Sequence, residues 1–258
     1  MLFSLLYDTG MNNPYMLGLT EVDSTNSYLA EEHNKKELPS GFILYTEIQT
    51  NGRGQGSNLW ESEPYKNLIF SVLFRPTNLL ARSIFTISEM VSLCVKYTLD
   101  RYIPDVSVKW PNDIYYKDKK IAGILIENSL VYTMIDYSII GIGININQRQ
   151  FLSDAPNPVS LSQITGLIYE KRNILYEFRE LFTAQSERLS NGHFDAIHQD
   201  YLDVIYRKNG YHNYRDANGV FEAVIHDIEP SGHLILKRID GRLSRYAYKE
   251  VMFCIFTP

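Results

Sequence analysis

The stretch that decides the fold is VSVKWPNDIYYKDKKIAGILIE, residues 106–127. Residues 106–110 predict a short strand that ends at Pro111. Residues 114–116 and 121–127 lie on either side of the polar turn KDKK, so they predict a β-hairpin. Three closely spaced strands therefore place a sheet in the middle of the chain.

Further strands and helices are predicted on both sides of this stretch. Apolar runs bounded by turn residues predict strands at 41–46, 68–74 and 137–146. Apolar residues at helical spacing predict helices at 81–102, 174–189 and 195–204. Asp23 or Ser24 can cap another helix that runs through residue 30. The first twenty residues are predicted to be irregular, because residues 12–14 (Asn-Asn-Pro) are turn formers.

The character of the sequence changes after Gly210. Short alternating strands are predicted at 220–228, 233–238 and 243–248. Gly232 and Gly241 stand between them, and the set is typical of a small β-barrel. We therefore predict an α+β fold in two domains. Residues 1–208 form a mixed sheet with flanking helices, and residues 209–258 form the barrel.

Composition narrows the classes of function. The 258 residues carry a net charge of -5, so the chain lacks the basic footprint of a DNA-binding protein. No apolar stretch approaches the roughly 18 residues of a membrane span, and residues 1–6 lack the regions of a signal peptide. Cys94 and Cys254 lie far apart in apolar runs. We expect buried, reduced thiols in a cytoplasmic protein with no DNA or membrane partner.

The segment QTNGRGQGSNLW, residues 49–60, is rich in glycine. Its glycines let the backbone approach a ligand closely, and Arg53 adds a forked donor suited to phosphate or carboxylate oxygens. It is not a Walker loop, because no Gly-Lys-Ser/Thr follows. Nor is it a Rossmann fingerprint, because the third glycine and the later acidic residue are misplaced. A solvated hairpin tip explains the same residues equally well.

Pro111 should aim Asn112 and Asp113 out of the strand end, where α/β sheets commonly contact ligands. Asp113 could hold Mg²⁺ or a ribose hydroxyl, because hard cations prefer oxygen ligands. An Asx turn is the alternative and explains these two residues better when they are taken by themselves. Lys120 follows Lys119 in a polar turn, where an exposed lysine is the ordinary expectation. However, Lys120 directly precedes a strand, whose start decides where its side chain points.

The segment GIGIN, residues 141–145, is a strand without a side chain at two alternate positions, Gly141 and Gly143. Something must therefore lie against that face, either a ligand or a packed helix. Asn145 could ligate a metal-bound phosphate. The run STN, residues 24–26, stands at a helix start. Capping explains one of its three polar residues, and the others could hydrogen-bond a polar ligand head.

Together these segments resemble the biotin protein ligases. The chain carries STN, then GRGQ and a tryptophan, then KWPND with KIAGILIE, then GIGIN, and it ends in a small β tail. Each motif is weak by itself, whereas four in the right order and spacing are specific. The resemblance covers essentially the whole chain. It implies the mixed-sheet fold shared with class II aminoacyl-tRNA synthetases, followed by an SH3-like barrel.

The resemblance also implies an enzyme, a biotin–[biotin carboxyl carrier protein] ligase. Biotin carboxylate would attack the α-phosphate of ATP and form biotinyl-5′-AMP and pyrophosphate. A lysine amine on the carrier domain of a biotin-dependent carboxylase would then attack the mixed anhydride, and AMP would leave. ATP and Mg²⁺ would serve as co-substrate and activator, with no prosthetic group. Positioning and charge stabilisation would supply most of the catalysis.

The same resemblance assigns roles to residues of these motifs. The expected biotin contacts are Ser24, Thr25, Asn26, Gln49, Arg53, Gly54, Gln55, Lys120 and Gly123. The expected nucleotide contacts are Trp60, Asn112 and Asn145, of which Asn145 would also help to hold the metal. The expected apolar wall is Trp110, Ile124 and Leu125. Lys120, Arg53 and Asp113 are the expected catalytic residues. Lys120 would offset charge that develops at the phosphate, and Asp113 would orient the acceptor lysine.

The chain departs from the family in two places. Some members have a loop of the form GRGRRGR, but here QGSN, residues 55–58, replaces most of that charge. The electrostatic share of the loop would therefore rest mainly on Arg53. Bifunctional members carry a winged helix-turn-helix repressor domain before the STN motif. Only about twenty residues precede the motif here, so we expect a ligase that is not a repressor.

Two other functions compete with this interpretation. A lipoate or octanoate ligase shares the fold, but it should carry a different Gly/His loop and a longer apolar slot. A non-catalytic biotin- or adenylate-binding regulator is the second, and the intact Lys120 and Asp113 argue against it. The sequence leaves open whether two copies form a homodimer, which carboxylase accepts biotin, and whether biotin or ATP binds first.

Overall fold

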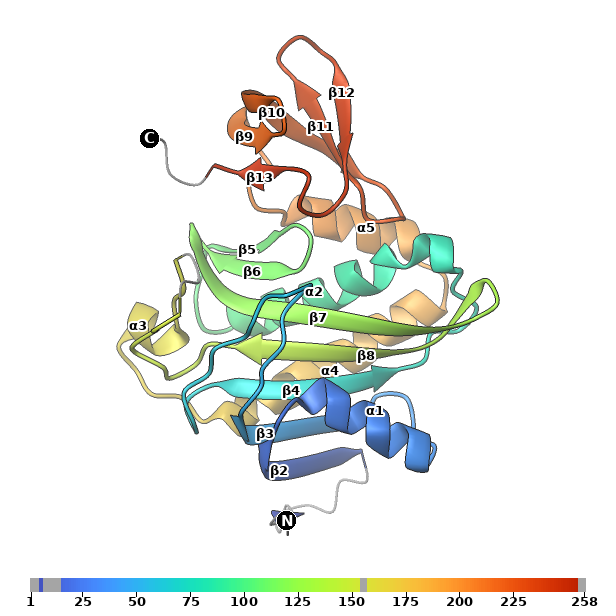
Figure 1. Ribbon diagram of the computed structural model, residues 1–258, viewed down its shortest axis with the longest axis vertical. Helices are drawn as coiled ribbons and strands as arrows, with labels where there is room; N and C mark the ends of the chain where they lie inside the picture. The colour runs from blue at the N-terminus through green and yellow to red at the C-terminus, as the bar shows by residue number, and fades with distance from the viewer. Residues whose placement is uncertain (1–4, 7–14, 154–156, 255–258) are drawn as a thin grey trace.

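The computed structural model describes residues 5–6, 15–153 and 157–254. Eight strands among these residues form one sheet in the order β1-β2-β3-β4-β8-β7-β6-β5 (Figure 1). Their bounds are β1 Leu5–Leu6, β2 Met16–Val22, β3 Ile43–Gln49, β4 Leu68–Phe74, β5 Val106–Lys109, β6 Asp113–Tyr116, β7 Lys119–Val131 and β8 Met134–Ile144. Only β2 and β3 pair in parallel, and the other neighbours are antiparallel. The predicted mixed sheet is therefore confirmed.

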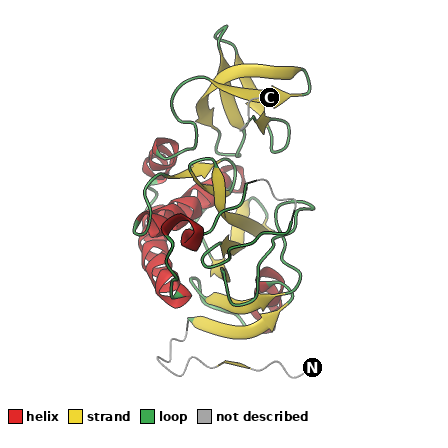
Figure 2. Ribbon diagram, turned by 90° about the vertical axis from the view of Figure 1, so that its left-hand side faces the viewer, coloured by secondary structure: helices red, strands yellow, loops and turns green. Residues whose placement is uncertain are grey.

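Helices cover both faces of this sheet. α2 (Phe85–Asp100) and α4 (Lys171–Ser190) lie on one face, and α1 (Thr25–Lys35) lies on the other (Figures 1 and 2). The shorter helical segments are η1 (Ala81–Ser83), α3 (Leu161–Thr165) and α5 (Phe194–Asp203). The helix predicted over 81–102 is thus divided into η1 and α2, while those predicted over 174–189 and 195–204 match α4 and α5 closely.

The alternation of side chains along β8 explains why the two faces differ. Three buried isoleucines join the large core beneath α2 and α4, namely Ile140, Ile142 and Ile144. Ile139 belongs instead to the smaller apolar cluster beneath α1. Gly141 and Gly143 share the face of Ile139, because strand residues two apart point the same way. The α1 face therefore has bare backbone in the middle of the sheet.

The prediction of an irregular N-terminal region is wrong for residues 5–6 and 16–20, because these residues belong to β1 and β2, which pair with each other. The turn predicted at residues 12–14 lies outside the described residues. Gly18 interrupts the apolar pattern of β2 and weakens its local strand signal. Packing accounts for this glycine. A Cβ atom on Gly18 would lie 2.5 Å from the hydroxyl of Tyr45, its neighbour on the parallel strand. Gly18 therefore weakens the strand signal in the sequence, yet the sheet needs a glycine there to make room for Tyr45.

A second, antiparallel sheet follows at the C-terminal end, in the order β12-β11-β10-β9-β13. Its strands are β9 His212–Asp216, β10 Gly219–Ile228, β11 Leu234–Arg238, β12 Leu243–Tyr246 and β13 Met252–Phe253. The three predicted strands match β10, β11 and β12, whereas β9 and β13 were not predicted. The fully buried Tyr214, Leu234 and Leu236 help to form its core. This sheet confirms the expected second β unit, and the boundary after residue 208 stays a prediction.

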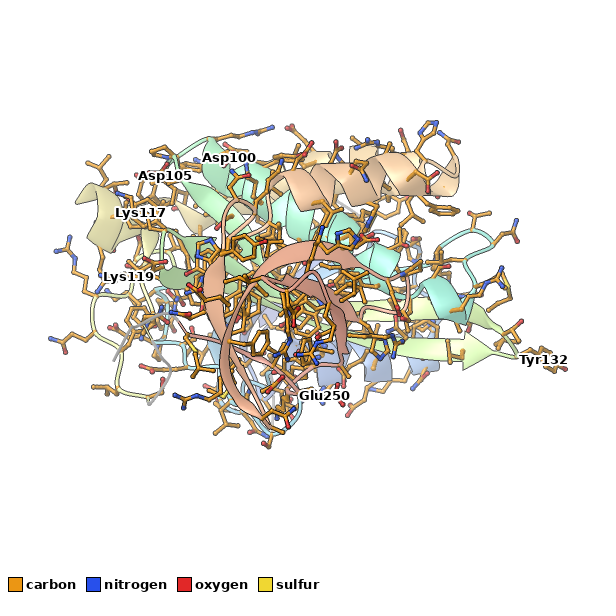
Figure 3. All side chains as sticks on the ribbon, turned by 90° about the horizontal axis from the view of Figure 1, so that it is seen from above. Asp100, Asp105, Lys117, Lys119, Tyr132 and Glu250 are labelled. Carbon is orange, nitrogen blue, oxygen red and sulfur yellow. The ribbon has the colours of Figure 1, made fainter. Side chains whose placement is uncertain are left out.

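The C-terminal sheet lies over the middle of the molecule when it is viewed from above, and Tyr132 projects at one edge (Figure 3). Several contacts attach this sheet to the rest of the chain. Trp110 donates from Nε1 to the carbonyl oxygen of Gly232 at 2.9 Å. His198 on α5 lies between Glu89 on α2 and Asp227 on β10, with N···O distances of 2.7 and 2.9 Å.

Two predictions from composition can be compared with the structure. No helix among the described residues is long and apolar enough to cross a membrane. Both cysteines are free thiols. Cys94 is buried as expected, but Cys254 is only partly buried, because it follows the short edge strand β13 instead of entering the core. The expectation of two buried thiols is therefore wrong for Cys254.

Candidate functional site

A cavity of about 450 Å³ lies on the α1 face of the main sheet. We call its base the floor, formed by Ile69, Gly123, Leu125, Gly141 and Gly143. We call the segment that covers it the flap, residues 52–60. All of the predicted site residues line this cavity except Asn145. The three residues predicted as an apolar wall, Trp110, Ile124 and Leu125, line it too. The structure thus brings together segments that lie far apart in the sequence.

The floor is bare because other groups occupy the space above its glycines. Gly123 on β7 and Gly143 on β8 are cross-strand partners. A Cβ atom on Gly143 would lie 2.6 Å from Nε1 of Trp60. A Cβ atom on Gly141 would lie 3.0 Å from Cγ of Asn26, which comes from α1. The packed-helix alternative for the GIGIN motif therefore holds at Gly141, whereas Trp60 of the flap covers Gly143, and a ligand on this face stays a prediction.

The flap is a small hairpin. Gly54 donates to the carbonyl oxygen of Asn58 at 2.8 Å, and the amide of Trp60 donates to that of Gly52 at 2.9 Å. Gly56 at its tip has a φ of 69°, a conformation that favours glycine. The hairpin tip that sequence analysis weighed as an alternative is therefore real, and it also covers the cavity. The Trp60 indole at the end of the flap packs against the floor, and its buried Nε1 has no hydrogen-bond partner among the described residues.

A polar cluster closes the α1 end of the cavity. Ser24 caps α1, and its Oγ accepts from the amide of Ser27 at 3.5 Å. The backbone amide of Thr25 donates to Oε1 of Gln49 at 2.9 Å. The Oγ of Ser71 lies 2.7 Å from that of Thr25 and 2.6 Å from Oδ1 of Asn26. Ser71 was not predicted as a site residue. Its one signal was a hydroxyl within the apolar strand LIFSVLF, where a buried polar group needs partners.

Arg53 forms a bidentate ion pair with Glu127 on β7. Its Nη1 lies 2.9 Å from Oε1 of Glu127, and its Nη2 lies 2.8 Å from Oε2. Glu127 also accepts from Nδ2 of Asn26 at 2.8 Å. The charge predicted to act on phosphate is therefore bound to a carboxylate of the sheet. Sequence analysis placed Glu127 in a motif but gave it no role.

Lys120 and Asp113 meet at the opposite end of the floor. The Lys120 Nζ lies 2.6 Å from Oδ1 of Asp113 and 5.7 Å from the centre of the Trp60 ring. Asn112 donates from Nδ2 to the carbonyl oxygen of Ile124 at 2.6 Å, and its own carbonyl oxygen accepts from the amide of Ile124. Lys120 is thus part of the cavity wall, whereas the side chain of Asn112 ties β6 to β7.

Lys109 is a cavity residue to which sequence analysis gave no role. Its Nζ donates to the hydroxyl of Tyr115 at 3.0 Å and lies 5.5 Å from the centre of the Phe253 ring. Burial lowers the pKa of Lys109, because desolvation disfavours its charged form. Burial likewise raises the pKa of the Tyr115 hydroxyl. The phenylalanine belongs to the C-terminal sheet, so no local pattern could have joined it to this lysine.

The C-terminal sheet supplies one wall of the cavity through Tyr248, Lys249, Met252 and Phe253, among others. The side chain of Asn58 on the flap forms a hydrogen bond with Tyr248, whose pKa is raised mainly by burial. Lys249 reaches the tip of the flap, where its Nζ would lie 3.2 Å from a Cβ atom on Gly56. None of these residues was predicted, because the sequence alone does not show which side of the barrel faces the sheet.

Asn145 lies outside the cavity lining. Its side chain is buried, and Nδ2 donates to the carbonyl oxygen of Val159 at 3.2 Å. Its Oδ1 has no hydrogen-bond partner among the described residues. Its backbone amide donates to the carbonyl oxygen of Ile121, and its backbone carbonyl oxygen accepts from the amide of Leu161. Asn145 therefore joins the end of β8 to two other segments, and the metal and nucleotide role expected for it stays a prediction. The described part of the chain holds no group of three or more His, Cys, Asp or Glu side chains that could bind a metal ion.

Most of the residues that line the cavity fall within a stretch of the chain that matches a known protein family. Residues 19–145 match the model of the biotin/lipoate A/B protein ligase family. The chain is 26% identical over 227 residues to the bifunctional ligase/repressor BirA of Bacillus spizizenii, which covers 86% of this chain and 69% of that protein. It is 33% identical over 144 residues to the chloroplastic biotin–protein ligase 1 of Arabidopsis thaliana, which covers 53% of this chain and 37% of that one.

Solved structures show the same fold. A biotin protein ligase from Aquifex aeolicus in complex with biotin and ATP has a TM-score of 0.74 at 24% identity, covering 94% of this chain and 98% of that one. A biotin protein ligase from Leishmania major in complex with biotinyl-5-AMP has a TM-score of 0.63 at 24% identity, covering 91% and 99%. Residues 19–145 of this chain are therefore similar to the biotin/lipoate A/B protein ligase family.

Proposed function

We propose that the protein is a biotin protein ligase. It would form biotinyl-5′-AMP from biotin and ATP and transfer biotin to a lysine of a biotin carboxyl carrier domain. The observation that carries this proposal is the single cavity that holds the STN, flap, KWPND and Lys120 residues together. The relatives described above, which are named as biotin protein ligases or bind biotin and ATP, support it.

The two ends of the cavity suit the two ends of biotin. The polar cluster of Thr25, Asn26 and Gln49 offers donors and acceptors in a small buried space, as a ureido ring requires. The floor also presents the apolar side chains of Ile69 and Leu125, which suit the apolar body of the ligand. The carboxylate would then point toward Lys120, about the length of the floor away from the cluster. Lys120 would attract this carboxylate and the α-phosphate to one place.

In the first step a carboxylate oxygen of biotin bonds to the α-phosphorus, and the bond from that phosphorus to the pyrophosphate oxygen breaks. Negative charge grows on the phosphate oxygens, and the fixed cation Lys120 stabilises it. In the second step the acceptor lysine, in its neutral form, attacks the carbonyl carbon and AMP leaves. Asp113 lies 2.6 Å from Lys120, so it is well placed to orient that amine and take up its proton.

Magnesium would arrive with ATP, as the MgATP complex. Mg²⁺ is commonly held by substrate phosphates together with one or two carboxylates, not by a cage of protein ligands. Asp113 is the carboxylate that lines the cavity, which fits this mode. The metal contact expected of Asn145 stays a prediction, and its side chain lies outside the cavity lining. The two-domain division at residue 208 and a cytoplasmic setting, in keeping with two free thiols, belong to the same proposal.

Mass spectrometry tests the proposal directly. The protein is incubated with a purified carrier domain, biotin and MgATP, and we expect one biotinyl group on one lysine of the carrier. Lipoate replaces biotin in a parallel reaction. Lipoylation without biotinylation would assign the chain to the lipoate branch. Biotin-dependent exchange of pyrophosphate into ATP checks the first step, and its absence in the presence of tight biotin binding would indicate a non-catalytic regulator.

A further inference from the structure

Glu127 joins two groups that the site needs in fixed positions. Its two carboxylate oxygens accept from Arg53 at 2.9 and 2.8 Å, and Oε2 also accepts from Nδ2 of Asn26 at 2.8 Å. Arg53 belongs to the flap and Asn26 to α1, so these partners come from two separate segments that line the cavity. The pairing of β7 with β8 uses the backbone of Glu127 opposite Ile139 and does not need this side chain.

The carboxylate sets the orientation of the Asn26 amide. An ionised carboxylate only accepts hydrogen bonds, so the NH₂ group of Asn26 must face Glu127. The carbonyl oxygen of Asn26 then points to Ser71, 2.6 Å away, and takes the hydroxyl proton of Ser71. Ser71 therefore has only lone pairs to offer Thr25, whose hydroxyl must donate to Ser71 or to Gln49. The order of donors and acceptors in the polar cluster thus starts at Glu127.

The ion pair with Arg53 is open to solvent. The side chains of Arg53 and Glu127 are 38% and 42% exposed, so water and salt screen their attraction. Such a pair holds the flap down without locking it. Asn26 is different, because it is buried at 3% exposure and its amide has no other charged partner in the structure's described residues. Glu127 therefore acts weakly on the flap and firmly on the cluster.

We propose that Glu127 is a positioning residue that couples the polar cluster to the flap. It orients Asn26 for the head of the ligand and, with the same carboxylate, holds Arg53 so that the flap covers the floor. A ligand head that engages Asn26 would then meet a flap already placed to cover it. The identity of this head as the ureido ring of biotin rests on the proposed function, whereas the coupling rests on the contacts of Glu127.

Hydrogen exchange of the ligand-free protein, followed by mass spectrometry, tests the coupling without any reaction. Glu127→Gln keeps an acceptor for Asn26 but removes the charge that holds Arg53. The amides of Gly54 and Trp60 on the flap should exchange roughly two- to fivefold faster, as expected for loss of a solvent-exposed ion pair. About 1 M salt should bring the flap of the original protein toward the same rate, because screening removes the same attraction. Unchanged flap exchange in Glu127→Gln would overturn the proposal.

The matched control is Glu177→Gln. Like Glu127, Glu177 contacts one uncharged donor and one arginine. It accepts from the Tyr102 hydroxyl at 2.9 Å and lies 3.5 Å from Arg101, but it is outside the cavity lining. It should leave flap exchange unchanged. Faster flap exchange in both variants would show a general loosening and count against a specific role for Glu127.

Steady-state pyrophosphate exchange tests the second half of the coupling. Glu127→Ala, which removes the acceptor of Asn26, should raise the KM for biotin by roughly tenfold while kcat changes by less than about twofold, because a positioning residue acts on ligand binding. Glu127→Gln should raise KM less. A fall in kcat with an unchanged KM would overturn the proposal. If the original protein shows no biotin-dependent exchange, the proposed function fails, and the hydrogen-exchange result still decides the coupling.

Discussion

The floor and the flap enclose the same cavity but are held in very different ways. The floor consists of strands paired along their length and backed by a core in which Ile140 and Ile144 are fully buried. The flap is held by a few backbone hydrogen bonds, by the exposed pair of Arg53 and Glu127, and by contacts with the C-terminal sheet. Segments with few buried contacts open at low free-energy cost. The comparison suggests that the floor carries the chemistry and the flap retains what the chemistry makes.

The largest effect should come from the floor end of the cavity. Lys120→Ala is expected to cost about 3 kcal/mol in the rate of adenylate formation, because a charged contact to the developing phosphate charge is lost. The matched control is Lys119→Ala, an exposed neighbour labelled at the outer edge in Figure 3. Single-turnover formation of biotinyl-5′-AMP measures both. Adenylate formation at the original rate in Lys120→Ala would contradict the catalytic role assigned to Lys120.

The next effect concerns the stability of the floor. Gly143→Ala places a methyl group against the Trp60 indole, 2.6 Å from its Nε1. Overpacking of this kind should lower the free energy of unfolding by about 1–3 kcal/mol, or displace Trp60 and raise the KM for nucleotide. Urea unfolding measures the first result and kinetics the second. In a Trp60→Ala background the same substitution should cost little, and an equal cost in both backgrounds would separate Gly143 from the flap.

An intermediate effect depends on pH and concerns the support that the C-terminal sheet gives the flap. Hydrogen bonding to Glu89 raises the pKa of His198 to about 9, from an ordinary value of 6.5. A raised folded-state pKa gives stability that is complete below pH 6.5 and is lost as the pH rises toward 9. Because Asp227 is half exposed, we expect a loss on the order of 1 kcal/mol. Thermal unfolding at increasing pH should show it, and His198→Gln should flatten the profile.

The smallest effect should come from the flap. Arg53→Gly removes the ion pair with Glu127 and is expected to shorten the retention of the adenylate roughly two- to fivefold, since exposed pairs contribute little. Biotinylation of a bystander protein such as albumin gives the readout. Arg53→Lys keeps the charge without the bidentate geometry and should lie between the two. Retention that does not change in either variant would assign the closing of the cavity to other contacts.

Local patterns predicted the elements of this fold unevenly. The strand over 68–74 was predicted with the bounds that β4 has, because it is a continuous apolar run bounded by turns. β2 was missed because Gly18 serves a contact with Tyr45 that the local sequence does not contain. β7 continues to Val131, beyond its predicted end, and β8 begins at Met134, before its predicted start. Pairing between the two strands keeps these residues extended although their own sequence pattern is weak.

The residues of the site likewise fall into those that the sequence could predict and those that it could not. Residues within motifs, such as Thr25 and Lys120, could be predicted to line one site because their order resembles that of a family. Ser71 and Glu127 could not, because their roles depend on strand register and on which face of β4 and β7 looks toward α1. Lys249 could not either, since it reaches the flap from the other sheet. Asn145 shows the converse, a motif residue whose side chain serves the backbone of Val159.

The two tryptophans of the chain both line the cavity but have different surroundings, and this gives the protein a pair of built-in optical probes. Trp60 lies on the floor beneath Lys120, so its emission should respond to any molecule that displaces the indole or changes the charge above it. Trp110 is buried and donates to Gly232 of the C-terminal sheet, so it reports on the seam between the sheets. With Trp110→Phe, titration of a ligand would follow the surroundings of Trp60 at the floor, and with Trp60→Phe it would follow Trp110 where the cavity meets the C-terminal sheet.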